Sequence, residues 1–261
     1  MIRKKYDIVF SIGEACLCVG ILSKLELRTF SSPFDWVSGA VLEERIQILL
    51  NDFANFLNQE DLEKTGQRDM PEPRDIYLNH RNQITFNHDF PLNGSLEKDY
   101  PEVKAKYDHR IKKLFSEIEA SKNVLMVYME LPTTEHKLAR STLQELVNLV
   151  NEKFKDTKID LLYIAHDENM PEGKGECEQV SDNLFIGKCF NRKRESDKDY
   201  NGNLKNAKLV LEGISCKKKL LDWCLYKLFK ALKKIGKIFY VKKLKHGEVY
   251  KRILGIKIKC K

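Results

Sequence analysis

The chain has 261 residues, 42% of them hydrophobic and 32% charged, which is enough for one sizeable domain and a smaller appendage. Its formal net charge of +8 is unevenly spread. Residues 216–261 hold fifteen lysines and one arginine against two acids, a net charge of +14 that leaves −6 for the preceding 215 residues. The basic character belongs to the C-terminal segment, so it does not indicate that the rest of the chain binds nucleic acid.

Seven scattered cysteines, an odd number in a chain too long to depend on disulfides, indicate a reducing compartment. Cys16 and Cys18 are separated by one residue and no matching Cys/His pair follows, so we expect no metal site. The sequence has no glycine-rich phosphate-binding motif and no run of about 18 apolar residues. These features predict a cytoplasmic protein that does not span a membrane and uses no cofactor.

Residues 6–12 form an almost continuous apolar run that is typical of a strand covered on both faces, and Gly13 ends it. A helix is predicted from Glu14 to Lys24, which places Cys16 at its N-terminus. There the helix dipole and unpaired backbone N–H groups favour a thiolate, the form of cysteine that acts as a nucleophile. The plainer alternative is that Cys16, like Cys18, is a core residue.

A loop follows, and a helix is predicted over residues 38–57 with Ser38 as its candidate cap. Two interpretations of the segment Pro33-Phe-Asp-Trp36 stay open. In one, Phe34 and Trp36 anchor the loop on the core while Asp35 caps the helix. In the other, Asp35 and Trp36 belong to a functional site, because loops often carry binding and catalytic residues.

Alternating polar and apolar residues predict a hairpin over residues 75–90, with His88 at its end. The later pattern predicts a helix at residues 101–121, a strand at 123–129, a helix from 133 or 134 to 154, and strands at 159–165 and 183–187. Residues 168–178 and 191–206 are predicted to be loops or turns. Strand, helix and strand in succession predict an α/β fold with a mostly parallel sheet flanked by helices.

His166 and Asp167 directly follow one of these strands. Because α/β proteins place ligands at the carboxyl ends of parallel strands, both residues are secondary candidates for a site. The other histidines lie among charged neighbours, where they are typically solvated, and we assign them no role.

Three blocks of sequence carry a resemblance to a known family: Ser11-Ile-Gly-Glu-Ala-Cys16 with Leu27-Arg-Thr and Ser32-Pro-Phe-Asp-Trp36, then Phe86-Asn-His-Asp-Phe90, then Tyr107-Asp-His-Arg-Ile111 followed by Val124-Leu-Met-Val. Together they resemble a bacterial domain family of unknown function described as putative papain-like cysteine peptidases. The likeness covers roughly residues 6–165. It also implies an alternative fold, α+β and papain-like, with the histidine on an antiparallel sheet.

The resemblance implies that Cys16 is a nucleophile, His88 its base, and either Asp89 or Asp35 the carboxylate that orients His88. Adjacent residues on a strand point to opposite faces, so Asp89 can orient His88 only if the strand has ended. Asp35 is therefore the favoured partner of His88.

The C-terminal segment predicts a basic helical appendage. On a helical projection of residues 219–237, leucines gather on one side and lysines on the other. Such a helix can lie on an anionic membrane surface, and we predict this contact for residues 217–237. The alternative is a helix docked on the domain with a solvated lysine face; a specific nucleic acid partner is not expected. We place the domain boundaries at residues 1–213 and 214–261.

The sequence therefore favours a cysteine hydrolase or acyltransferase, peripheral to the inner face of the membrane, that acts on an unidentified peptide, acyl or glycan substrate. One alternative is a glycan-modifying transferase of surface-polysaccharide assembly in which Cys16 is structural. The ending Ile253-Leu-Gly-Ile-Lys-Ile-Lys resembles the closing segments of enzymes encoded with bacterial surface polysaccharides. A further alternative is a non-catalytic assembly factor recruited to the membrane.

Overall fold

The computed structural model describes residues 3–69, 72–134, 137–192, 197–217, 241–245, 248–253 and 256–259. The chain divides into two compact units, Met1–Lys217 and Lys218–Lys261. The first unit carries every residue that the sequence proposes for chemistry.

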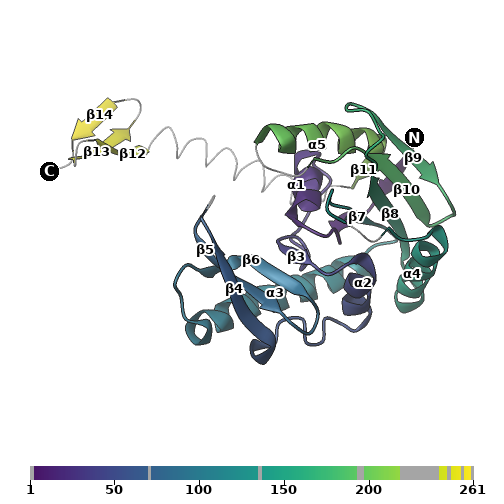
Figure 1. Cartoon of the computed structure of the whole chain (residues 1–261), viewed down its shortest axis with the longest axis horizontal. Helices are drawn as coiled ribbons and strands as arrows, with labels where there is room; N and C mark the ends of the chain where they lie inside the picture. The colour runs from purple at the N-terminus through teal and green to yellow at the C-terminus, as the bar shows by residue number, and fades with distance from the viewer. Residues whose placement is uncertain are drawn as a thin grey trace. The chain divides into compact units, whose positions relative to one another are not determined.

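The centre of the first unit is a five-stranded sheet with the order β2-β7-β8-β10-β9 (Figure 1). Its strands are β2 (Ile8–Ser11), β7 (Asn123–Met129), β8 (Lys158–His166), β10 (Leu184–Cys189) and β9 (Gly175–Gln179). The first four are parallel, and β9 joins the edge antiparallel to β10. The parallel arrangement brings the carboxyl ends of four strands to one edge of the sheet.

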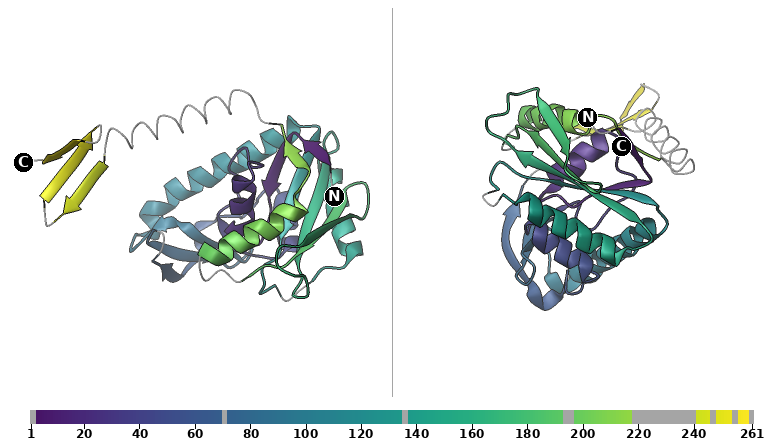
Figure 2. Two further views of the ribbon diagram at one scale, coloured as in Figure 1. Left: turned by 90° about the horizontal axis from the view of Figure 1, so that it is seen from above. Right: turned by 90° about the vertical axis from the view of Figure 1, so that its right-hand side faces the viewer.

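Helices cover both faces of this sheet because successive residues of its strands alternate between two hydrophobic clusters. Val127 of β7 packs with α1 (Cys16–Lys24) and α5 (Asp197–Val210), while its neighbour Tyr128 faces the opposite cluster. That second cluster includes α2 (Leu42–Leu50), α3 (Leu96–Glu119) and α4 (Arg140–Lys153). The result is three layers with the sheet in the middle (Figure 2).

A second, antiparallel sheet packs against α3 and carries His88. Its order is β3-β6-β5-β4, formed by β3 (Val37–Gly39), β6 (Ile84–Pro91), β5 (Arg74–Asn79) and β4 (Leu62–Arg68). Phe86 of β6 contacts Tyr107 of α3, with ring centroids 5.2 Å apart. Aromatic pairs of this kind bury large apolar areas and fix the sheet on the helix.

Smaller elements complete the described structure. They are the parallel pair β1 (Lys4–Tyr6) and β11 (Ile214–Cys216), and the 3₁₀ helix η1 (Gln59–Asp61). The described part of the second unit is an antiparallel sheet of β12 (Val241–Lys245), β13 (Glu248–Ile253) and β14 (Ile256–Lys259). Within the described ranges, the helices are all too short or too polar to cross a bilayer.

The prediction of an α/β fold with a mostly parallel, helix-flanked sheet is confirmed. The papain-like alternative implied a histidine on an antiparallel sheet, and His88 does lie on β6. The amphipathic helix predicted at residues 219–237 falls on residues outside the described ranges, as does most of the segment 217–237 proposed for membrane contact. Residues 214–216, which we expected to begin the appendage, pair as β11 with β1.

Several predicted elements differ from the structure for identifiable reasons. The helix predicted at residues 38–57 is shorter, because Ser38 belongs to β3 and Gly39 and Ala40 adopt positive φ before α2 begins. α3 begins about one turn before Pro101, which lies inside it. The segments 168–178 and 191–206 were predicted as loops but contain most of β9 and α5. Neither element has a clear hydrophobic pattern, because β9 is a polar edge strand and α5 is a highly charged helix.

Candidate functional site

Cys16 begins α1 just beyond the carboxyl end of β2, as the sequence predicts. Cys16 is half-buried, whereas Cys18 is 3% exposed and its Sγ contacts the carbonyl of Val127. The first turn of α1 contains no acidic residue. Because a helix N-terminus attracts negative charge, this position suits a thiolate and leaves it accessible to a ligand.

The turn before Cys16 requires a glycine. A Cβ placed on Gly13 would lie 2.5 Å from the Cβ of Cys18, which is closer than real Cβ atoms approach one another. The Gly13 N–H donates to the Ser11 hydroxyl at 3.2 Å and closes the turn. The sequence break at Gly13 therefore reflects close packing of the turn on α1.

A buried guanidinium lies beneath the same turn. Arg45 of α2 is fully buried and donates to the carbonyls of Glu14, Gly39 and Ala40. Burial lowers the pKa of Arg45 to about 10, so it remains a cation at neutral pH. This charge also opposes the effect of burial on the neighbouring Cys18, whose pKa is raised to about 12. Arg45 thus adds positive potential under the start of α1.

The loop after α1 is held to the end of β2 by Asp35. This carboxylate is 1% exposed and accepts bonds from the Ser32 N–H at 2.9 Å and from Nε and Nη2 of Arg28 at 2.9 and 2.7 Å. Ser32 in turn donates its hydroxyl to the carbonyl of Ser11 at 3.3 Å. Burial raises the pKa of Asp35, and the charge of Arg28 opposes that rise. Asp35 organises this loop and does not cap α2.

Trp36 connects this loop to His88. The rings of Trp36 and His88 meet edge to face with centroids 5.6 Å apart, and the Arg28 guanidinium lies 5.8 Å from the Trp36 ring. Trp36 is half-buried and packs between the loop and His88, and its place in a functional site stays a prediction. The loop therefore links the β2–α1 turn, where Cys16 lies, to the strand that carries His88.

His88 lies on an irregular part of β6. Tyr77 pairs with Phe86 and Asp75 pairs with Phe90, so β6 has extra residues at this point and forms a bulge around His88. Bulges change the direction of side chains and are frequent next to active sites. The regular alternation that we assumed from the sequence does not apply across these residues.

A cation lies against the ring nitrogens of His88. Arg68 Nη1 lies 2.9 Å from Nδ1 and 3.0 Å from Nε2 of His88. Burial and the charge of Arg68 lower the pKa of His88, although Asp89 opposes them. The imidazole is therefore neutral at neutral pH, and one ring nitrogen is occupied by a donor.

Neither proposed carboxylate is hydrogen-bonded to His88 among the described residues. Asp89 instead accepts from the Tyr107 hydroxyl at 2.8 Å and forms an ion pair with Lys106. Asp35 is engaged with the loop described above. The structure brings Trp36 and His88 together and places Asp35 and Asp89 in separate networks.

His166 and Asp167 belong to a satisfied polar cluster at the carboxyl edge of the main sheet. His166 accepts the Asn191 N–H at Nδ1 (3.0 Å) and donates its own backbone N–H to the buried Glu130 at 2.7 Å. The Asp167 side chain accepts the Asn169 N–H within its own turn. Glu130 also accepts the Tyr163 hydroxyl. These contacts hold both residues at the carboxyl edge of the main sheet, and their place in a functional site stays a prediction.

Sequence reasoning missed the arginines that surround the candidate residues. Arg45 and Arg68 carry no recognisable pattern, because the contact of Arg45 with Glu14 depends on how α2 packs under the β2–α1 turn, and that of Arg68 with His88 depends on the register of β4, β5 and β6. Arg28 lies in Leu27-Arg-Thr, one of the segments that resemble the family, and this was the one feature of the sequence that could have pointed to an arginine at the site. Cations and carboxylates therefore alternate at this site, with Arg28 paired to Asp35 and Arg68 beside His88.

A half-buried cysteine at a helix N-terminus, on an α/β sheet with a histidine on a neighbouring antiparallel sheet, defines a candidate thiol-dependent protein. Comparison with known families extends this description. Residues 7–169 match the family described as "putative papain-like cysteine peptidase", and the chain belongs to that family.

One similar protein is the "Uncharacterized protein R408" of Acanthamoeba polyphaga mimivirus. It is 25% identical over 171 residues, which cover 60% of this chain and 76% of the relative. The bacterial origin expected from the resemblance finds no support in this viral relative. No solved structure matches the chain.

Proposed function

We propose that the first unit is a cysteine hydrolase or acyltransferase with Cys16 as its nucleophile and His88 as its general base. The observation that carries this proposal is the position of Cys16, half-buried at the N-terminus of α1 and at the carboxyl end of β2. Membership of a family described as cysteine peptidases agrees with it. The substrate class is a compound with an amide, ester or thioester carbonyl.

The reaction would run through a thioester. His88 takes the proton of the Cys16 thiol, Sγ attacks the carbonyl carbon, the C–N, C–O or C–S bond of the substrate breaks, and His88 gives the proton to the leaving group. Water in a hydrolase, or a second nucleophile in an acyltransferase, then attacks the thioester and regenerates the thiol. Backbone N–H groups in the first turn of α1 supply donors for the oxyanion.

The proposal requires Arg68 to give up a ring nitrogen of His88. An imidazolium has no lone pair to accept the Arg68 hydrogen bond, so proton uptake by His88 and retention of this bond exclude each other. A ligand that attracts the guanidinium would leave His88 able to act as a base. Catalytic hydrogen bonds are often incomplete before substrate binds, which fits this arrangement.

The test is the rate of iodoacetamide labelling at each cysteine, followed from pH 5 to 9 by peptide mass spectrometry. We expect Cys16 to react at least about tenfold faster than Cys18 at pH 7, because Cys18 is buried and its pKa is raised to about 12. His88→Ala should reduce this advantage. His80→Ala is the matched control, since His80 is an exposed residue paired with Glu63.

If Cys16 is labelled as slowly as Cys18, the proposal that Cys16 is the nucleophile is wrong. If Cys16 is labelled fast and equally in wild type, His88→Ala and His80→Ala, Cys16 remains the proposed nucleophile and His88 is excluded as its base.

A further inference from the structure

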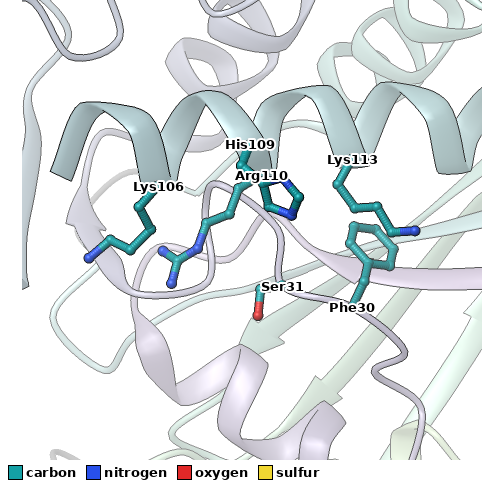
Figure 3. A pocket seen from close by; sticks show the side chains of 6 residues that line it. All are labelled: Phe30, Ser31, Lys106, His109, Arg110 and Lys113. Atoms are coloured by element: carbon teal, nitrogen blue, oxygen red, sulfur yellow. The ribbon is translucent and has the colours of Figure 1, made fainter. Parts of the chain in front are cut away.

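A separate pocket of about 420 Å³ lies between α3 and the loop that follows α1 (Figure 3). Its lining residues are Phe30, Ser31, Lys106, His109, Arg110 and Lys113. The volume falls within the range of about 300–1,000 Å³ that is usual for small-molecule sites. None of these lining residues was assigned a role by the sequence or by the proposed reaction.

Cations dominate the wall formed by α3. Lys106, Arg110 and Lys113 are spaced by four and three residues, which places them on one helical face, and Figure 3 shows Arg110 extending to the side where Ser31 lies, with Lys106 and Lys113 on either side of it. The lining contains no carboxylate. Two of the three cations have acidic partners outside the lining, since Lys106 pairs with Asp89 and Lys113 with Glu117.

Arg110 differs from the two lysines because part of it is buried without a partner. Its Nη1 is inaccessible to solvent and makes no hydrogen bond, while its guanidinium stacks 5.1 Å from the ring of Tyr107. The charge of Arg110 also lowers the pKa of nearby Asp35, against the larger effect of burial. Because Nη1 is shielded from solvent, the other N–H groups of the guanidinium are the ones that can donate to a ligand in the pocket that Arg110 lines.

The loop side of the pocket adds a hydroxyl and an aromatic ring. Ser31 Oγ accepts from Arg28 Nη2 at 2.6 Å, which leaves the Ser31 hydroxyl hydrogen for a second acceptor. Phe30 is half-buried and supplies an apolar surface beside the charged groups. Three cations, a hydroxyl donor and one aromatic ring suit a ligand with an anionic end and an apolar or ring-shaped body.

We propose that this pocket binds the phosphate group of a small phosphorylated molecule, with Arg110 as the principal anchor. Lys106 and Lys113 add charge, Ser31 donates a hydrogen bond, and Phe30 contacts the group that bears the phosphate. A phosphate dianion matches three cations better than a single carboxylate does, and its oxygens fit the fork of an arginine. The site does not depend on Cys16 or His88.

The test is isothermal titration calorimetry of the full chain with phenyl phosphate, whose ring probes Phe30, and with inorganic phosphate. The lysine-rich C-terminal segment also attracts anions, so the comparison of variants decides the result. Arg110→Gln should weaken binding about tenfold or more. Arg140→Gln is the matched control, because Arg140 of α4 carries the same charge in an exposed ion pair with Glu178 of β9.

Two further variants keep the test decisive if Arg110→Gln fails to fold. Lys113→Gln, at an exposed position, should weaken both ligands by about threefold. Phe30→Leu should weaken phenyl phosphate and leave inorganic phosphate unchanged. Equal binding by all variants and the Arg140→Gln control, or no binding by wild type at about 10 mM ligand, would overturn the proposal.

Discussion

Polar side chains gather at the carboxyl edge of β7, β8 and β10 and also around the loop that follows α1, but the two groups are organised differently. In the first group, Glu130 receives the Tyr163 hydroxyl and the His166 N–H, and His166 receives the Asn191 N–H. In the second, Arg110 retains a buried N–H without a partner. Satisfied groups stabilise the fold, whereas the cations that line the pocket beside α3 form the site proposed above for an anion.

The largest effect is expected from Glu130→Ala, which should lower the free energy of unfolding by about 3 kcal/mol. Glu130 is fully buried, and its loss leaves the Tyr163 hydroxyl and the His166 N–H without acceptors. Urea denaturation followed by circular dichroism measures the change.

Glu178→Ala is the matched control for this experiment, because Glu178 forms an exposed ion pair with Arg140. This substitution should lower the free energy of unfolding by less than about 0.5 kcal/mol. Equal losses in both variants would show that the carboxyl-edge cluster contributes no more than a surface pair, and the contrast between the two regions would fail.

A smaller effect, visible in the titration of one residue, is expected from Arg68→Gln. Burial and the charge of Arg68 lower the pKa of His88 from its usual 6.5, so removing the charge should raise it. Histidine ring signals followed by NMR across pH measure the shift. Arg81→Gln, which removes a cation paired with Asp61, should leave the His88 titration unchanged.

The same lowered pKa links His88 to stability. The unfolded chain takes up the proton more readily than the folded one, so the stabilisation is present above pH 6.5 and is lost as pH falls through the folded pKa. Arg68→Gln should reduce this acid sensitivity. If the His88 titration is unaltered in Arg68→Gln, the close contact between the two side chains does not exist in solution.

The smallest effect is expected at the amino edge of the sheet, where Asp7 accepts the N–H groups of Lys122 and Asn123 and pairs with Lys217. The hydrogen bond from Lys217 is the main cause of the lowered pKa of Asp7. Asp7→Asn should lower the free energy of unfolding by about 1 kcal/mol or less at pH 7. The pKa of Asp7 in the folded chain lies below 3.8. The difference in unfolding free energy between Asp7→Asn and wild type should therefore shrink as pH falls through that folded pKa.

The parallel sheet and the position of Cys16 could be predicted from the sequence because both depend on local patterns. Apolar runs such as residues 123–129 are typical of strands buried on two faces, and Gly13 marks the turn that leads into α1. The strand β9 and the helix α5 were missed, since their polar composition resembles that of loops.

The environment of His88 could not be predicted from the sequence. Its strand is identifiable, but the bulge in β6 depends on the register between β5 and β6. That register sends Asp89 to Tyr107 and leaves His88 beside Arg68, whereas regular alternation favoured Asp35 as its partner.

By itself, the sequence determined the α/β class, the four parallel strands of the main sheet and a cysteine at a helix N-terminus, because hydrophobic periodicity and glycine placement are local properties. The tertiary structure alone decided which charges meet. Arg110 of α3 lines the same pocket as Ser31 of the loop after α1, and Arg68 of β4 lies beside His88 of β6 within one antiparallel sheet. Electrostatic partners depend on distances in space, and a one-dimensional pattern does not contain them.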